Sequence, residues 1–151
     1  MHSHIGCIQM TSGTDVKENL LTAKELIQQA VDQGAGLIVL PENFALMGQN
    51  PLDKVKHREK FGNGLIQDFL QKEAEQHQAW IVGGTIPLAT DSPDQVRAAC
   101  LVYNESGKCM ARYDKIHLFD VKISQGDEVH QESKTCLLYT SGRCRRRLRC
   151  R

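Results

Sequence analysis

The stretch Leu37-Ile-Val-Leu-Pro-Glu-Asn-Phe44 decides the fold class. Its first four residues are wholly apolar, which is typical of a short strand that is covered on both faces. Pro41 ends this strand, so Glu42 follows its carboxyl end directly. In open α/β sheets the crevice beyond the carboxyl ends of the strands is where ligands bind. Glu42 is therefore a candidate general base, and the alternative is an ordinary loop acid exposed to water.

The sequence on both sides of this strand predicts alternating strands and helices. Thr14 or Asp15 can cap a first helix that closes at Gly34 and Gly36, and a weaker helical pattern covers 54–60. Helices between the early strands imply parallel pairing, and a closing hairpin with its turn at 105–108 makes the sheet mixed. We therefore expect an α/β fold with flanking helices. Its remaining elements are a helix marked by Leu65 to Ala74 and strands at 4–10, 37–40, 80–86, 98–104 and 109–114.

A second candidate, Lys115, ends the strand 109–114 much as Glu42 follows its own strand. An ammonium group at that position can stabilise a developing oxyanion. The alternative is a solvated lysine that pairs with Asp114. Glu132 lies among the polar residues 130–134, and this composition alone indicates the surface.

The composition of the chain indicates one soluble globular domain of 151 residues, with 40% hydrophobic and 25% charged residues. The segment 136–151 contains six of the 19 basic residues and no acid, so 1–135 keeps 13 basic and 18 acidic residues, a net charge of −5. This acidic body argues against nucleic acid or an anionic membrane as its partner.

The basic segment 136–151 fits no helix or strand period, and we interpret it as a non-native tail. Its start, Cys-Leu-Leu-Tyr-Thr-Ser, is encoded by TGT CTC TTA TAC ACA TCT, which resembles a transposase adapter used in sequencing libraries. Read-through into such an adapter is a cloning or sequencing artefact and is excluded from reasoning about the fold. The alternative is a basic arm that contacts nucleic acid.

The remaining signals concern compartment, thiols and metals. No apolar run approaches the ~20 residues of a membrane span, and residues 1–4 lack a secretory pattern, so a cytoplasmic location is expected. Cys7, Cys100 and Cys109 fall in strand patterns and are predicted to be buried thiols. The histidines show no ligand spacing with cysteine or acid, so neither a metal nor another cofactor is expected.

Three segments together resemble the nitrilase (carbon–nitrogen hydrolase) superfamily: 37–44, 113–121 and 131–134. The resemblance implies an αββα sandwich, a homo-oligomeric full-length parent, and an active site with Glu42, Lys115 and Glu132. It also implies a nucleophilic cysteine a few tens of residues after the last of these segments. We therefore expect 1–135 to be the N-terminal part of such a domain. The expected fold is a partial sandwich truncated before the C-terminal half, with an incomplete site that is near background in activity.

The motifs Pro-Glu-Asn-Phe and Ile-His-Leu-Phe-Asp most resemble the small-acid amidase branch, which includes ω-amidases and deaminated-glutathione amidases. The implied substrate is a small-molecule amide of a carboxylic acid. A nitrilase, an N-carbamoyl hydrolase and a catalytically dead member that serves as an interaction module remain alternatives. A truncated sandwich is also expected to expose apolar surface and to be poorly soluble.

Overall fold

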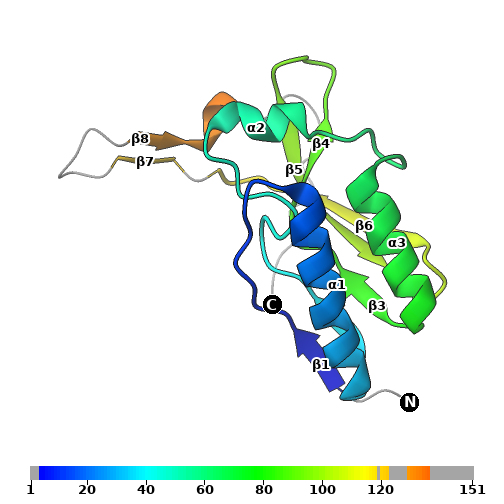
Figure 1. Ribbon diagram of the computed structural model, residues 1–151. Coiled ribbons are helices and arrows are strands. Elements are labelled where there is room, and N and C mark those ends of the chain that lie inside the picture. Colours follow the sequence, from blue (N-terminus) through cyan, green and yellow to red (C-terminus); the bar gives the residue numbers. More distant parts are fainter. Residues whose placement is uncertain (1–3, 119, 123–128, 137–151) are drawn as a thin grey trace, which may run out of the picture.

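The computed structural model describes residues 4–118, 120–122 and 129–136. Figure 1 shows the two longer helices, α1 and α3, beside each other over one face of a sheet. The described elements are β1 (His4–Cys7), α1 (Val16–Asp32), β2 (Ala35–Val39), α2 (Pro51–Lys56), α3 (Leu65–His77), β3 (Trp80–Val82), β4 (Ile86–Ala89), β5 (Val96–Tyr103), β6 (Cys109–Asp114), β7 (Asp120–Lys122), β8 (Val129–Gln131) and a short 3₁₀ helix (Glu132–Lys134).

The main sheet is mixed, as the sequence predicted. β1, β2 and β3 pair in parallel, whereas β5 pairs antiparallel with β3, β4 and β6. The strand order is β1-β2-β3-β5-β4, with β6 also bonded to β5. β2 therefore has a strand on each side, and Glu42 lies beyond its carboxyl end.

The predicted strand 80–86 is divided into β3 and β4, which pair with successive halves of β5. Gly83 keeps the ladder intact by donating its N–H to Leu101 O over 2.8 Å. Gly84 has a φ of +53°, and a Cβ there would overlap the carbonyl oxygen of Pro41. The backbone of Gly84 therefore lies very close to the turn before Glu42, and only a residue without a side chain fits there.

The core lies between the helices and one face of the sheet. Gly6, Ile38, Ile81 and Tyr103 form a row across four strands on this face, and a Cβ at Gly6 would meet Ala30 of α1 at 2.8 Å. Ile38 and Ile81 are fully buried. The neighbouring rows must point to the opposite face because side chains alternate along a strand.

The opposite face of the sheet is apolar and partly exposed. Ile5 is 64% exposed and Trp80 is 37% exposed, and both flank Leu37 in one row. Cys7 lies on this face too and is exposed, so its predicted burial is wrong. The helices cover only the other face, which a strand pattern alone does not reveal. Cys100 and Cys109 are partly buried.

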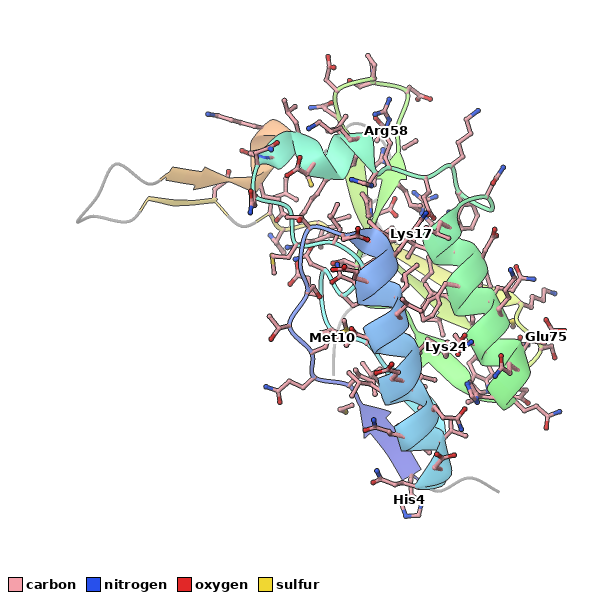
Figure 2. The ribbon with its side chains drawn as sticks, viewed as in Figure 1. His4, Met10, Lys17, Lys24, Arg58 and Glu75 are labelled. Carbon is pink, nitrogen blue, oxygen red and sulfur yellow. The ribbon has the colours of Figure 1, made fainter. Side chains whose placement is uncertain are left out.

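The helix ends follow from their capping residues. Asp15 caps α1, since its Oδ1 accepts from Lys17 N at 2.8 Å and Glu18 N at 3.2 Å. Asn50 caps α2, so the weak helical pattern at 54–60 becomes a helix that begins earlier, at Pro51. Lys24 of α1 reaches Glu73 of α3 over 3.7 Å, where the two helices adjoin (Figure 2).

The hairpin of β7 and β8 was not predicted, and it leads into the 3₁₀ helix that carries Glu132. Within the described part of the chain, no helix is long and apolar enough to cross a membrane. Most of the expected non-native tail, 137–151, lies outside the described residues.

Candidate active site

Glu42 occupies a tight turn immediately after β2. Leu40 N donates to Val82 O over 2.9 Å, which holds the end of β2 against β3. Asn43 has a φ of +58°, and its N–H donates to Thr85 Oγ1 over 3.2 Å. The turn is therefore anchored on both sides, while the Glu42 side chain stays 53% exposed. Such a carboxylate is fixed at its backbone and open to a ligand.

Lys115 follows β6, and its N–H donates to Ala98 O over 2.8 Å. Its Nζ lies 2.8 Å from Glu42 Oε1 and 3.0 Å from Glu132 Oε2. Asp114 instead accepts two hydrogen bonds from Arg112, at 2.7 and 3.0 Å. The alternative in which Lys115 pairs with Asp114 is therefore not what the structure shows.

Glu132 is buried, with a side chain only 5% exposed, although the polar composition of residues 130–134 indicated the surface. The 3₁₀ helix turns it inward, because Thr135 N and Cys136 N donate back to its carbonyl oxygen at 3.2 and 2.9 Å. Asp120 Oδ1 accepts from Ser133 N at 3.0 Å and ties this turn to β7. This hydrogen bond is also the main cause that lowers the pKa of Asp120.

The three predicted residues thus lie together, with the Lys115 ammonium bridging two carboxylates. Partial burial alone would lower the pKa of Lys115. Hydrogen bonds from Lys115 to Glu42 and to Glu132, together with their negative charges, outweigh that effect and raise the pKa. Lys115 is therefore a cation at neutral pH, as an oxyanion-stabilising group must be.

Lys54 of α2 completes this cluster, and sequence reasoning missed it. Its Nζ lies 3.2 Å from Glu132 Oε1, so each oxygen of Glu132 faces a different ammonium group. Lys54 sits in a run of charged residues at 53–60, which on its own indicates a solvated surface. No local signal in the sequence singles out this lysine, because its partner lies 78 residues away.

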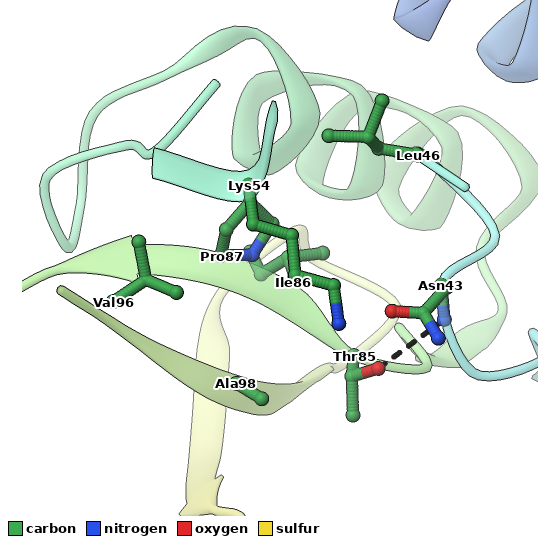
Figure 3. A pocket seen from close by; sticks show the side chains of 8 residues that line it. All are labelled: Asn43, Leu46, Lys54, Thr85, Ile86, Pro87, Val96 and Ala98. Carbon is green, nitrogen blue, oxygen red and sulfur yellow. Dashed lines mark hydrogen bonds between the residues drawn. The ribbon is translucent and has the colours of Figure 1, made fainter. Parts of the chain in front are cut away.

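A cleft of about 160 Å³ opens beside this cluster, large enough for a small ligand group. Its wall combines the loop before α2 with both partners of the Lys54–Glu132 pair. A smaller cavity of about 10 Å³ adjoins it and shares Lys54 and Asn43 (Figure 3). The cleft is lined by Asn43, Met47, Gly48, Gln49, Asn50, Pro51, Lys54, Glu132 and Thr135.

Cys136 also reaches the cluster, with Sγ 3.9 Å from Glu132 Oε1. Its side chain packs with Val96, and the residue is only 2% exposed. Burial raises the pKa of this thiol, and the Glu132 charge adds to the effect while Lys54 opposes it. A buried, protonated thiol is a poor nucleophile. Among the described residues, no group of three or more His, Cys, Asp or Glu side chains could hold a metal ion.

Comparison with known proteins gives the family. The family model described as carbon-nitrogen hydrolase matches residues 4–138. The chain belongs to the carbon–nitrogen hydrolase family. Its relatives include deaminated glutathione amidases from Synechocystis, 39% identical over 132 residues, and from Yersinia enterocolitica, 32% identical over 135 residues. These alignments cover 86% and 89% of this chain but 47% and 46% of those proteins. A human omega-amidase is 29% identical over 87% of this chain and 46% of its own length.

Solved structures of the nitrilase superfamily share the fold. The Caenorhabditis elegans NitFhit protein superposes with a TM-score of 0.73 and 25% identity, over 90% of this chain and 33% of its own. Saccharomyces cerevisiae Nit3, a member of branch 10 of that superfamily, superposes with a TM-score of 0.67 and 25% identity, over 75% and 44%. The mixed sheet with flanking helices is thus part of the nitrilase fold. The chain spans about half the length of the curated relatives that it matches.

Proposed function

We propose that Glu42, Lys115 and Glu132 belong to the active site of a cysteine-dependent amidase that hydrolyses the amide of a small carboxylic acid. The observation that carries this proposal is the Lys115 ammonium, whose Nζ lies 2.8 Å from Glu42 and 3.0 Å from Glu132. Amidase names among the relatives of this family member support the substrate class. The substrate is then a small non-peptide amide.

In the proposed mechanism each of the three side chains has its own task. Glu42, which is half exposed, takes the proton from the cysteine and later activates water. Lys115 stabilises the negative oxygen that forms when the thiolate attacks the carbonyl carbon. The carbon–nitrogen bond then breaks as the nitrogen takes the proton from Glu42 and leaves as ammonia, and water hydrolyses the remaining thioester. Glu132 is buried and orients the substrate while it supports proton transfer.

The proposal places the nucleophilic cysteine outside this chain. Cys136 reaches the cluster but is buried with a raised pKa, and relatives about twice as long leave room for a later cysteine. We further propose that 136–151 is a non-native tail and that the 151-residue chain is near background in activity. Loss of a nucleophile from a group that acts as a unit costs several orders of magnitude in rate.

For the full-length parent we propose a cytoplasmic homo-oligomer without a metal or other cofactor. Nucleic acid and membranes are not among the proposed partners. The net charge of −5 over 1–135 supports this for nucleic acid and anionic membranes, because an acidic body is repelled by both.

The experiment begins with the gene in its source genome, read beyond the codon of Thr135. We expect a cysteine codon a few tens of codons further on and no adapter sequence. The encoded protein should release ammonia from the ω-amide of a small dicarboxylic acid, whereas a nitrile and an N-carbamoyl amino acid test the alternatives. Without a downstream cysteine the amidase proposal fails, and the interaction module takes its place.

Variants of the encoded protein then test the individual roles. Glu42→Gln and Lys115→Met should each lower kcat by roughly 10²–10⁴-fold, the range for a lost general base or oxyanion stabiliser. Glu105→Gln, in the exposed turn between β5 and β6, serves as the matched control and should leave kcat unchanged. Unchanged hydrolysis by Glu42→Gln would remove Glu42 from the mechanism.

A further inference from the structure

Lys54 stands out among the charged residues of α2 because it faces inward. Its side chain is 22% exposed, whereas that of Lys56 on the same helix is 66% exposed and pairs with Asp53. Lys54 Nζ lies 3.2 Å from Glu132 Oε1. An inward ammonium beside a buried carboxylate has a task other than solvation.

The geometry around Glu132 explains that task. Its carboxylate is 5% exposed, and a buried charge needs compensating partners. One oxygen faces Lys54 at 3.2 Å and the other faces Lys115 at 3.0 Å. With both oxygens held, the carboxylate cannot rotate about its terminal torsion, and Oε2 stays directed at Lys115.

Lys115 in turn depends on Glu132 for its orientation. Its Nζ contacts Glu42 and Glu132 at the same time, so the Lys115 side chain lies between two carboxylates. If Glu132 turned away, Lys115 would keep a single partner, Glu42, whose side chain is 53% exposed. Solvent competes strongly for such a pair. The order of dependence therefore runs from Lys54 through Glu132 to Lys115.

We propose that Lys54 is a positioning residue, which fixes Glu132 and through it the ammonium of Lys115 that the proposed amidase mechanism requires. This inference rests on the proposed function for its purpose but on the ion pairs for its geometry. α2 holds the backbone of Lys54 in place, since the Asn50 capping box stabilises the first turn of this helix. Lys54 also lines the cleft of about 160 Å³, so this helix forms part of the wall of the cleft.

The test measures the ammonium groups themselves in the 151-residue chain labelled with ¹⁵N-lysine. In the unmutated 151-residue chain, the ammonium protons of Lys54 and Lys115 should both exchange slowly with water, because both groups are paired. In Lys54→Met, exchange at Lys115 should accelerate about tenfold or more, as loss of a charge-assisted hydrogen bond implies. Lys54→Arg should restore slow exchange, since a guanidinium also reaches a carboxylate.

Lys56→Met is the matched control, because it removes a lysine from the same helix that does not contact Glu132. It should leave the Lys115 signal unchanged. Slow exchange at Lys115 in a folded Lys54→Met chain would overturn the inference. If that variant does not fold, the unmutated 151-residue chain provides the test. Rapid exchange of the Lys54 ammonium in that chain would equally overturn the inference.

The ammonium signals require no substrate, so they separate the two proposals. Accelerated exchange in Lys54→Met, with no amide hydrolysis by the longer gene product, would uphold the positioning role and refute the amidase. Hydrolysis by that product, with unaltered exchange at Lys115 in Lys54→Met, would do the reverse.

Discussion

Lys115 Nζ lies 2.8 Å from Glu42 Oε1, although 73 positions separate the two residues in the sequence. The sheet alone does not produce this contact, because β2 and β6 are not neighbours in it. The turn after β2 must also be held at a fixed height. Gly84 does this, since its backbone packs directly against the carbonyl of Pro41.

Gly84→Ala should therefore disturb Glu42 as well as the fold. The added Cβ would overlap Pro41 O at a φ of +53°, so the turn that carries Glu42 must move. We expect a loss of unfolding free energy of roughly 1–3 kcal/mol beyond the backbone strain, as for overpacking in a core. Urea unfolding measures the loss, and the Lys115 ammonium signal reports the displaced partner.

Gly62→Ala provides the control for that substitution. Gly62 has a φ of +85°, yet a Cβ there would meet nothing within 4 Å. The substitution Gly62→Ala should therefore cost about 1 kcal/mol of unfolding free energy, which is the conformational penalty of a left-handed residue, without a clash. Equal losses of unfolding free energy in the two variants would show that contact with Pro41 does not hold the turn.

The sequence alone predicts where Glu42 and Lys115 stand in the fold, and it does so for a local reason. Lys115 directly follows β6, and Glu42 follows β2 after Leu40 and Pro41. Both strands are predicted from their own residues, and strand ends gather at the edges of a sheet. The mixed order of the sheet was also predictable, because helices separate the first three strands and a turn joins β5 to β6. Short-range patterns therefore fix where these two side chains begin.

The rest of the site depends on contacts between distant segments, which no local pattern reports. Glu132 looks like a surface residue in sequence and is buried only because the β7–β8 hairpin and the 3₁₀ helix fold it inward. Lys54 lies in a charged run and is distinguished only by its contact with Glu132. The exposure of Cys7 escaped prediction because a strand pattern does not tell which face the helices cover.

The loop at the wall of the cleft should loosen in acid. Asp53 Oδ2 accepts from Gln49 N and Asn50 N, both at 3.1 Å. The backbone hydrogen bond from Asn50 is the largest cause that lowers the pKa of Asp53 below 3.8, and Lys56 adds to it. A carboxyl with a lowered folded-state pKa contributes stability above its unfolded pKa and loses it as the pH falls through the folded value.

We therefore expect the stability difference between the parent and Asp53→Asn to be constant above about pH 5 and to shrink below about pH 4. Urea unfolding of both chains across this range measures the difference. A difference that grows as the pH falls would contradict the assigned direction of the Asp53 pKa shift.

Alkylation should distinguish the exposed and buried thiols. Cys7 is exposed on the uncovered face of the sheet, whereas Cys136 is buried and burial raises its pKa. With limiting iodoacetamide, Cys7 should react roughly tenfold faster or more, because only an accessible thiolate attacks. Mass spectrometry of the two peptides gives the rates, and the denatured chain, in which both should react alike, is the control. Faster reaction at Cys136 than at Cys7 would show that the Cys136 thiol is accessible and would contradict its burial.

Glu59 should matter to α3 more than any acid on the helix itself. Gly64 precedes α3 and supplies no side-chain cap. The Glu59 carboxylate takes over this task by accepting from Ile66 N at 2.6 Å and Gln67 N at 3.2 Å. Glu59→Gln removes a negative charge from a helix N-terminus and should cost about 1–2 kcal/mol of unfolding free energy.

Glu75→Gln is the matched control for this last prediction, because Glu75 is exposed near the carboxyl end of α3 (Figure 2). A negative charge is unfavourable at that end of a helix, so its removal should leave stability unchanged or raise it by a few tenths of a kcal/mol, about the size of an exposed dipole effect. If Glu59 is the cap, thermal and urea unfolding should show a loss of stability in Glu59→Gln and no loss in Glu75→Gln. A loss of stability in Glu75→Gln as large as that in Glu59→Gln would show that general charge, and not the contact with Ile66 and Gln67, stabilises α3.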